Sequence, residues 1–268
     1  MKLKVQSLWM MLLICCCAVS VSQAGSKSDL AKEQRWESQI VDSLLVGEAV
    51  KLNAGGVQFL GLYAENQSDP AKGGVVIMHG IGAHPAWPDV IEPLRMNLPD
   101  RGWHTLSIQM PILENEAEGK DYIPLFDEVP GRINAAVKFL QDKGVAPIMV
   151  VAHSLGASMA GYYLSQQPSF AVKAAVLIGF GTMSDDPDSK FSSLHMVKNI
   201  HISLFDLYGA NDLKPVLKYA PERKRIEADM HNKNFRQQKV DGANHFFQGK
   251  ESVLIKTVDS WLSEQAGK

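Results

Sequence analysis

A serine and a histidine in separate parts of the chain have surroundings typical of nucleophilic catalysis. Ser154 lies in the sequence AHSLG, where an apolar run ends. Small neighbours permit a tight strand-to-helix turn there, which holds a serine hydroxyl clear of the backbone. A serine hydroxyl needs a base to take its proton. His245, in the turn-rich stretch DGANH, is the best candidate base, and the pair predicts attack of Ser154 on a carbonyl carbon.

An acid must fix the tautomer of such a histidine and stabilise its protonated form. Asp212, after the turn-forming sequence YGAN, is the expected acid. Asp206, inside the preceding apolar run, and Asp241, near His245 in sequence, remain alternatives. The order serine, aspartate, histidine along the chain is the order expected when the serine occupies a strand-to-helix turn.

Two backbone amides are expected to bind the oxyanion that forms during acyl transfer. The turn itself places the N–H of Leu155 for this purpose. The second donor is expected from the loop HGIG at residues 79–82, whose glycines let the main chain approach a substrate. The N–H of Ile81 is the predicted donor, with that of Gly82 as the alternative.

Each of these residues also has a structural interpretation. Serine is a common N-terminal cap of helices, so Ser154 is alternatively only a cap. His245 is alternatively a loop histidine without a chemical role. The complete set of residue types in the expected chain order favours the catalytic interpretation over either of these.

The surrounding pattern predicts strands that alternate with helices after an antiparallel start. Expected strands cover 48–53, 56–64, 74–78, 103–109, 148–152, 174–178, 202–208 and 235–240. Expected helices cover 88–98, 131–143, 155–166 and 216–230, followed by a closing helix with Leu254, Val258, Trp261 and Leu262 on its inner face. Pro221 is expected to bend or break the helix that contains it. The class is therefore α/β, with a mostly parallel sheet whose ligand site lies beyond the carboxyl ends of the strands.

The first 24 residues are expected to be a cleaved export signal rather than part of the fold. Lys2 and Lys4 precede a mostly apolar run at 8–21, which is shorter than the roughly 20 residues of a membrane-spanning helix. A retained membrane anchor is the alternative. The three cysteines, at 15–17, all lie in this segment, so no disulfide is expected in the domain predicted for 25–268. The expected location is the periplasm or the exterior of the cell.

Charge and histidine spacing exclude several classes of ligand. The net charge of −2 gives no basic excess to attract nucleic acid or an anionic membrane, so a small uncharged or mildly polar molecule is the expected partner. His79, His84 and His153 lack the spacing of metal ligands, and no metal or organic cofactor is expected. The basic residues 223–225 are expected to form a solvated helix face. The sequence leaves the oligomeric state open.

These motifs resemble those of the α/β-hydrolase superfamily over about residues 45–265. The run HGIGAHPAWPDVIEPLRMNLPDRGWHTLSIQMP, at 79–111, is similar to an exported bacterial family described only as a domain of unknown function. The resemblance implies an eight-stranded, mostly parallel sheet and a catalytic triad of Ser154, His245 and Asp212. Alanine in place of the usual first glycine of the serine motif also occurs in some lipases that resemble this sequence.

The reaction that the resemblance implies is hydrolysis, most simply of a carboxylic ester, with a thioester or amide as alternatives. A non-catalytic envelope binding or scaffold protein with the same fold is the rival from another class. Lyase, dehalogenase and haloperoxidase variants of the fold are further rivals. Dehalogenases of this fold use aspartate as the nucleophile, so Ser154 argues against that activity.

The segment 181–199, where this superfamily often carries a cap over the site, is short. A cap of this size is expected to leave the pocket open. Four apolar side chains in the segment are candidates for an acyl pocket, and simple packing is the alternative. They are Met183, Phe191, Leu194 and Met196.

Overall fold

Strands and helices alternate along most of the chain. The computed structural model describes residues 26–166, 171–229 and 234–267. The strands are β1 (Glu48–Ala54), β2 (Val57–Ala64), β3 (Gly73–Met78), β4 (Trp103–Ile108), β5 (Ile148–His153), β6 (Val172–Ile178), β7 (Ser203–Asn211) and β8 (Phe235–Asn244). The α-helices are α1 (Leu30–Ser43), α2 (Ile91–Asn97), α3 (Val129–Asp142), α4 (Leu155–Gln166), α5 (Ser193–Asn199), α6 (Lys214–Asp229) and α7 (Glu251–Ala266). The predicted export signal, with its cysteines, lies outside the described residues.

The strands form one sheet of eight, in the order β1-β2-β4-β3-β5-β6-β7-β8. β2 runs antiparallel to both of its neighbours, and every other pair is parallel. The predicted α/β class and mostly parallel sheet are confirmed. Every residue of β3 and β5 is buried, which explains why their sequences are apolar without alternation.

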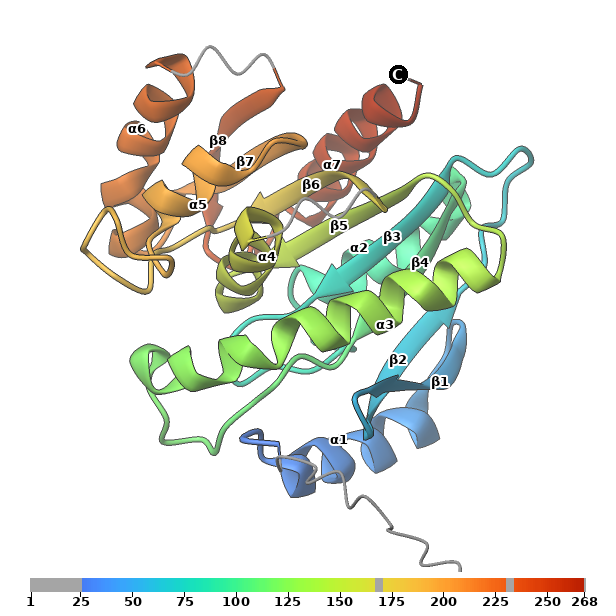
Figure 1. Ribbon diagram of the computed structural model, residues 1–268. Helices are drawn as coiled ribbons and strands as arrows, with labels where there is room; N and C mark the ends of the chain where they lie inside the picture. Colours follow the sequence, from blue (N-terminus) through green and yellow to red (C-terminus); the bar gives the residue numbers. More distant parts are fainter. Residues whose placement is uncertain (1–25, 167–170, 230–233, 268) are drawn as a thin grey trace, which may run out of the picture.

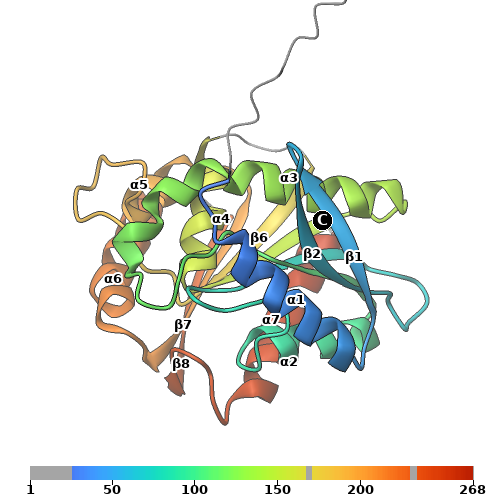
Figure 2. The ribbon, with the colours of Figure 1, turned by 90° about the horizontal axis from the view of Figure 1, so that it is seen from below.

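Helices cover both faces of this sheet (Figures 1 and 2). Side chains of a strand alternate between the two faces. Val76 and Met78 of β3 therefore join the apolar cluster that includes residues of α3 and α4. Val75 and Ile77 join the cluster that includes residues of α2 and α7. The two clusters hold the sheet rigidly between the helix layers, with its strand ends available for a site.

Helix α1 was not expected from the sequence. The side chain of Ile40, in this helix, packs on Leu60 and Leu62 of β2. Its other buried residues are Lys32 and Glu33, which are charged. Because charged residues occupy much of its inner face, the helix lacks the apolar period that predicts an amphipathic helix.

Helix α6 corrects two expectations. It runs continuously past Pro221, so the predicted division into two pieces is wrong. Arg223 is wholly buried, although the basic stretch 223–225 was expected to be solvated. The helical period places Arg223 on the inner face of α6, where its Nε donates to Oδ2 of Asp206 at 2.8 Å. Lys224 and Arg225 are exposed, as predicted.

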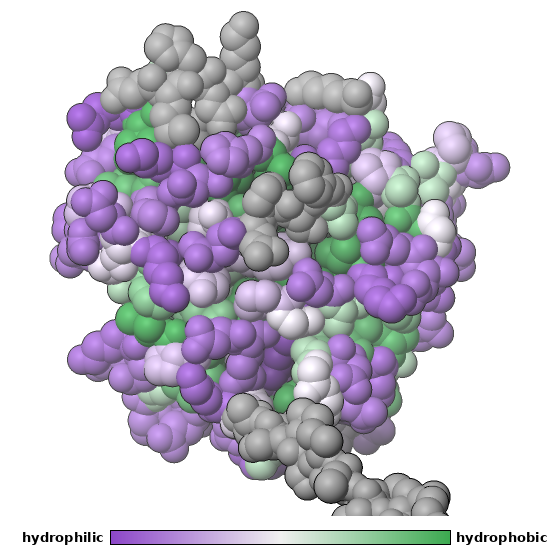
Figure 3. Space-filling model, in the orientation of Figure 1, coloured by the Kyte–Doolittle hydropathy of each residue, from purple (hydrophilic) through white to green (hydrophobic). Residues whose placement is uncertain are grey.

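The surface of the face on which α3 lies is mostly hydrophilic, with apolar atoms visible between the polar side chains (Figure 3). Among the described residues, no helix combines the length and the apolar character needed to cross a bilayer.

Replacing Arg223 by leucine tests the ion pair with Asp206. Both side chains are 0% exposed, so the substitution leaves a buried carboxylate without its cation. We expect the free energy of unfolding, measured with urea, to fall by about 3 to 5 kcal/mol. The matched control is Arg225→Leu, on the exposed side of the same helix, which should lower the free energy of unfolding far less. Equal unfolding midpoints for the two variants would show that the buried pair is not a structural anchor.

Candidate active site

Ser154 occupies a tight turn between β5 and α4. Its φ of 57° lies in the left-handed region that L-residues seldom adopt. The turn is held because the Ser154 N–H donates to the carbonyl of Ile178 on the neighbouring strand, at 2.9 Å. A Cβ at Gly156 would overlap the carbonyl oxygen of His79, so the glycine allows α4 to start against the end of β3. The structure therefore has the strained strand-to-helix turn that the motif predicts.

The structure brings His245 and Asp212 to this serine. The Nε2 atom of His245 lies 2.9 Å from Oγ of Ser154, and its Nδ1 atom lies 2.6 Å from Oδ1 of Asp212. Asp212 follows β7, and His245 follows β8, so all three side chains come from the carboxyl ends of parallel strands. These ends meet at one edge of the sheet because the strands run in the same direction.

The environment of Asp212 keeps its carboxylate ionised. Burial raises the pKa, but the hydrogen bond and charge of His245 outweigh it, with further help from the N–H groups of Leu213 and Gly209. The net effect holds the pKa of Asp212 below its ordinary value. An ionised carboxylate only accepts hydrogen bonds, so Nδ1 of His245 carries the proton. The lone pair of Nε2 then faces the hydroxyl of Ser154.

Neither of the two alternative acids takes the place of Asp212. Asp206 is buried against Arg223, and its Oδ2 also accepts a hydrogen bond from Gln237 at 2.8 Å. Asp241 is exposed. Of the three aspartates considered from the sequence, the structure places Asp212 in contact with the imidazole of His245.

The predicted oxyanion donors lie beside the serine. A Cβ built on Gly80 would be 2.9 Å from Cβ of Ser154, so the loop containing Ile81 closely approaches the turn. Leu155 is the first residue of α4, where N–H groups have no partner within the helix. No acceptor from the described part of the chain bonds the amides of Ile81, Leu155 or Gly82. Both predicted donors and the alternative, Gly82, are thus available to a ligand.

His79 fixes the backbone of the glycine loop. Its Nε2 accepts the N–H of Met110 at 2.9 Å, and its Nδ1 donates to the carbonyl of Gly80, also at 2.9 Å. Complete burial lowers the pKa of His79 to about 3, so the ring is neutral and can make both bonds. The histidine was considered from the sequence only as a metal ligand, although its place before the glycine could have suggested this role.

His153 fixes the backbone of the residue that carries the predicted base. Its Nε2 donates to the carbonyl of His245 at 2.9 Å, and the centres of the two rings are 4.8 Å apart. Burial, and then the charge of His245, lower the pKa of His153 to about 4. A neutral ring beside the site keeps a second positive charge away from the imidazole. This contact could not be predicted from the sequence because it joins residues 92 positions apart.

A buried ion pair supports the loop after β4 from the side of α1. Arg132 donates to both carboxylate oxygens of Glu33, at 2.8 and 2.9 Å, and to the carbonyl of Gln109 at 2.8 Å. The side chain of Gln109 in turn lies 3.1 Å from Nε2 of His79. Helix α1 is thereby connected, through polar contacts, to the loop that carries the predicted oxyanion donor.

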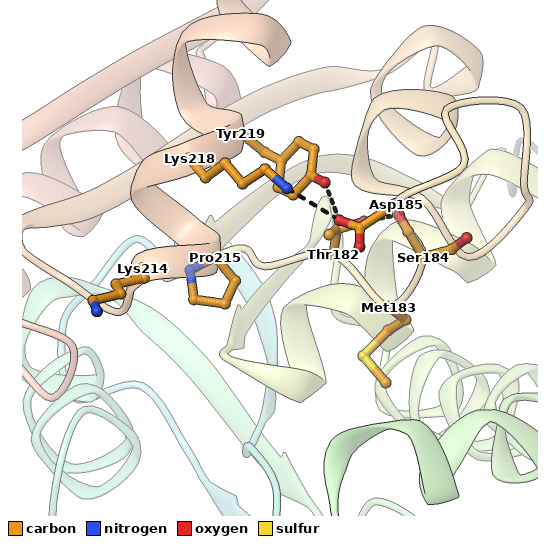
Figure 4. A pocket seen from close by; sticks show the side chains of 8 residues that line it. All are labelled: Thr182, Met183, Ser184, Asp185, Lys214, Pro215, Lys218 and Tyr219. Atoms are coloured by element: carbon orange, nitrogen blue, oxygen red, sulfur yellow. Dashed lines mark hydrogen bonds and ion pairs between the residues drawn. The ribbon is translucent and has the colours of Figure 1, made fainter.

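A pocket of about 370 Å³ lies between the segment after β6 and the start of α6. It is lined by Thr182, Met183, Ser184, Asp185, Lys214, Pro215, Lys218 and Tyr219 (Figure 4). Within it, Asp185 accepts hydrogen bonds from Lys218 and Tyr219. Its walls begin three residues after Gly179 and two residues after Asp212, and neither Ser154, Asp212 nor His245 lines it.

Of the four apolar residues expected to form an acyl pocket, Met183 alone lines this one. Met196 is buried in the core, and Leu194 is buried as well. Phe191 stacks on Tyr162, with ring centres 5.7 Å apart. For these three the alternative of simple packing describes the structure, because α5 packs on α4.

The described residues contain no group of histidine, cysteine and acidic side chains arranged to hold a metal ion. The chemistry that the arrangement can perform is that of a hydroxyl, an imidazole, a carboxylate and nearby free amides.

Gly179 provides a test of the imidazole position. A Cβ at this residue would lie 2.9 Å from Cε1 of His245, and its φ of 60° disfavours any side chain. We expect Gly179→Ala to displace the imidazole and slow the reaction of Ser154 with a fluorophosphonate by about 100-fold. The matched control is Gly181→Ala, where an added Cβ meets no atom within 4 Å. Equal labelling rates for the two variants would contradict the contact.

The buried histidines predict how stability changes with pH. The pKa values of His79 and His153, about 3 and 4, lie below the ordinary 6.5, so the unfolded chain binds protons that the folded chain excludes. Their contribution to stability is complete above pH 6.5 and is lost as the pH falls toward 4. For each unit by which the pH falls in this range, each histidine should lower the free energy of unfolding by about 1.4 kcal/mol.

Urea unfolding measured between pH 6.5 and 4.5 tests this sign. The variant His153→Gln, which keeps a donor for the carbonyl of His245, should have a slope smaller by about 1.4 kcal/mol per pH unit. A wild-type stability that does not change over this range, or an unchanged slope in the variant, would contradict the buried neutral state.

Comparisons of structure agree with the fold described above. One similar structure is Est1E from Butyrivibrio proteoclasticus with bound ferulic acid, at a TM-score of 0.64 and 15% identity, covering 82% of this chain and 100% of that one. Another is a cold-adapted esterase from an Arctic intertidal metagenomic library, at a TM-score of 0.64 and 16% identity, covering 81% of this chain and 92% of that one. Dienelactone hydrolase from Anabaena variabilis is similar at a TM-score of 0.59 and 19% identity, covering 81% of this chain and 96% of that one.

Comparisons of sequence identify the family. No curated protein matches the chain in sequence. Residues 11–122 and 125–264 match the family described as "Protein of unknown function (DUF3530)", in agreement with the resemblance to a family of unknown function. The chain therefore has the α/β-hydrolase fold and belongs to the DUF3530 family.

Proposed function

We propose that this protein is a serine hydrolase that cleaves a carboxylic ester of a small molecule through an acyl-enzyme. The observation that carries the proposal is the continuous set of hydrogen bonds from Ser154 through His245 to Asp212, with distances of 2.9 and 2.6 Å. Three groups in this order match the requirements of a nucleophile, a general base and an orienting acid. Two of the similar structures are an esterase and a dienelactone hydrolase, which supports the same reaction class.

In the first half of the reaction, Nε2 of His245 takes the proton of the Ser154 hydroxyl. The oxygen Oγ attacks the ester carbonyl carbon, and the π electrons of the carbonyl move to its oxygen. The free amides of Leu155 and Ile81 donate to this oxyanion. Collapse of the intermediate breaks the ester C–O bond, and the leaving alkoxide takes the proton from Nε2.

In the second half, a water molecule takes the place of the alcohol. His245 removes a proton from the water as its oxygen attacks the acyl carbon, and collapse releases the carboxylic acid while Oγ of Ser154 regains a proton. The ionised Asp212 stabilises the imidazolium in both halves. No step needs an organic cofactor or a metal. A thioester or an amide could undergo the same sequence; an amide needs more help than an ester to expel its leaving group, and a thioester needs less.

Export is part of the proposal. The basic start, the short apolar run and the small residues before position 25 support a cleaved signal, so we place the activity in the periplasm or outside the cell.

Labelling of the protein lacking residues 1–24 with a fluorophosphonate tests the proposed function. We expect labelling of the wild type and none of Ser154→Ala, because the reagent needs an activated serine. Asp212→Asn should lower kcat for p-nitrophenyl acetate by about 10⁴-fold, because the imidazole loses its correct tautomer. Label that persists in Ser154→Ala would identify a different nucleophile. A folded wild type that neither labels nor hydrolyses the ester would favour a non-catalytic binding or scaffold protein.

A further inference from the structure

Exposed apolar side chains gather around the proposed catalytic residues. The described part of the chain exposes seven large apolar side chains. Three of them, Ile81, Leu213 and Phe246, are 41%, 52% and 40% exposed. Each lies on a different loop at the site, next in sequence to Gly80, Asp212 and His245 respectively. We call these three side chains the apolar rim.

Hydrogen bonds and a ring contact hold two of the rim residues beside the proposed catalytic groups. The N–H of Leu213 donates to Oδ1 of Asp212 at 2.7 Å. The N–H of Phe246 donates to Oδ1 of Asn244 at 3.0 Å, and its ring centre lies 5.1 Å from that of His245. These contacts hold the backbones of Leu213 and Phe246 beside Asp212 and His245, where both side chains are exposed.

The loops that carry the rim contain no basic side chain. The segments 80–82, 209–213 and 243–246 contain no lysine or arginine. In the pocket between the segment after β6 and the start of α6, Lys218 is paired with Asp185. Lys214, which follows Leu213 and also lines this pocket, extends away from that pair (Figure 4). A negative group on the substrate would therefore meet no cation within the three rim segments, and Lys214 is the next basic residue along the chain.

We propose that the apolar rim binds the hydrocarbon part of the substrate, so that the preferred ester carries an uncharged acyl chain of medium length. This inference depends on the proposed ester hydrolysis. Covering three half-exposed apolar side chains with a chain of methylene groups removes apolar surface from water on both sides, which favours binding. An acetyl group has a single methyl, so it removes less apolar surface from water than a longer acyl chain.

The ratio of kcat/KM for p-nitrophenyl octanoate to that for p-nitrophenyl acetate tests the rim. The ratio should exceed one in the wild type and fall by about tenfold in the double variant Leu213→Ser/Phe246→Ser, because only the longer chain contacts these side chains. The matched control is Leu45→Ser, an 89% exposed apolar residue after α1, which should leave the ratio unchanged. An unchanged ratio in the double variant would overturn the proposal.

A second measurement separates the rim from catalysis itself. In the Ser154→Ala background, binding of p-nitrophenyl octanoate is measured by calorimetry, with and without the two rim substitutions. A dissociation constant raised about tenfold by the rim substitutions, but not by Leu45→Ser, would support the rim even if the wild type hydrolysed no ester. Equal dissociation constants in all three proteins would overturn the rim while leaving the proposed hydrolysis intact.

Discussion

The imidazole of His245 must reach two groups at once, and the rest of the site is arranged around this constraint. Its two nitrogens lie 2.9 Å from the Ser154 hydroxyl and 2.6 Å from the Asp212 carboxylate, although the three residues come from distant parts of the chain. A parallel sheet satisfies the constraint because β5, β7 and β8 end at the same edge. Small changes in the position of any of these ends would break one of the two contacts.

Buried polar groups hold the strand ends in place. Neutral His153 bonds the carbonyl of His245, and neutral His79 bonds the carbonyl of Gly80. The ion pair of Arg132 with Glu33 brings α1 into the same network through the loop after β4. Burial makes these groups costly to leave unpaired, so each contact fixes one backbone conformation. The serine turn, with its unfavourable φ, persists because this surrounding structure determines it.

Much of the fold and the positions of the proposed triad could be predicted from the sequence. Apolar runs and helical periods located all eight strands, and the strand ends indicated Ser154, Asp212 and His245. Contacts between distant residues could not be predicted in this way. The pairing that buries Arg223 depends on Asp206 in another element, and the role of His153 depends on a carbonyl 92 residues away. Helix α1 was missed because its inner face contains charges that only tertiary pairing neutralises.

In the proposed reaction, one hydroxyl, one imidazole and two amides converge on a single reacting carbonyl. A crystal structure of the protein after reaction with a diethyl fluorophosphate tests it most directly. We expect the phosphorus bonded to Oγ of Ser154, with the phosphoryl oxygen within about 3 Å of the amide nitrogens of Leu155 and Ile81. A phosphoryl oxygen directed to solvent, or an adduct on another residue, would contradict this convergence.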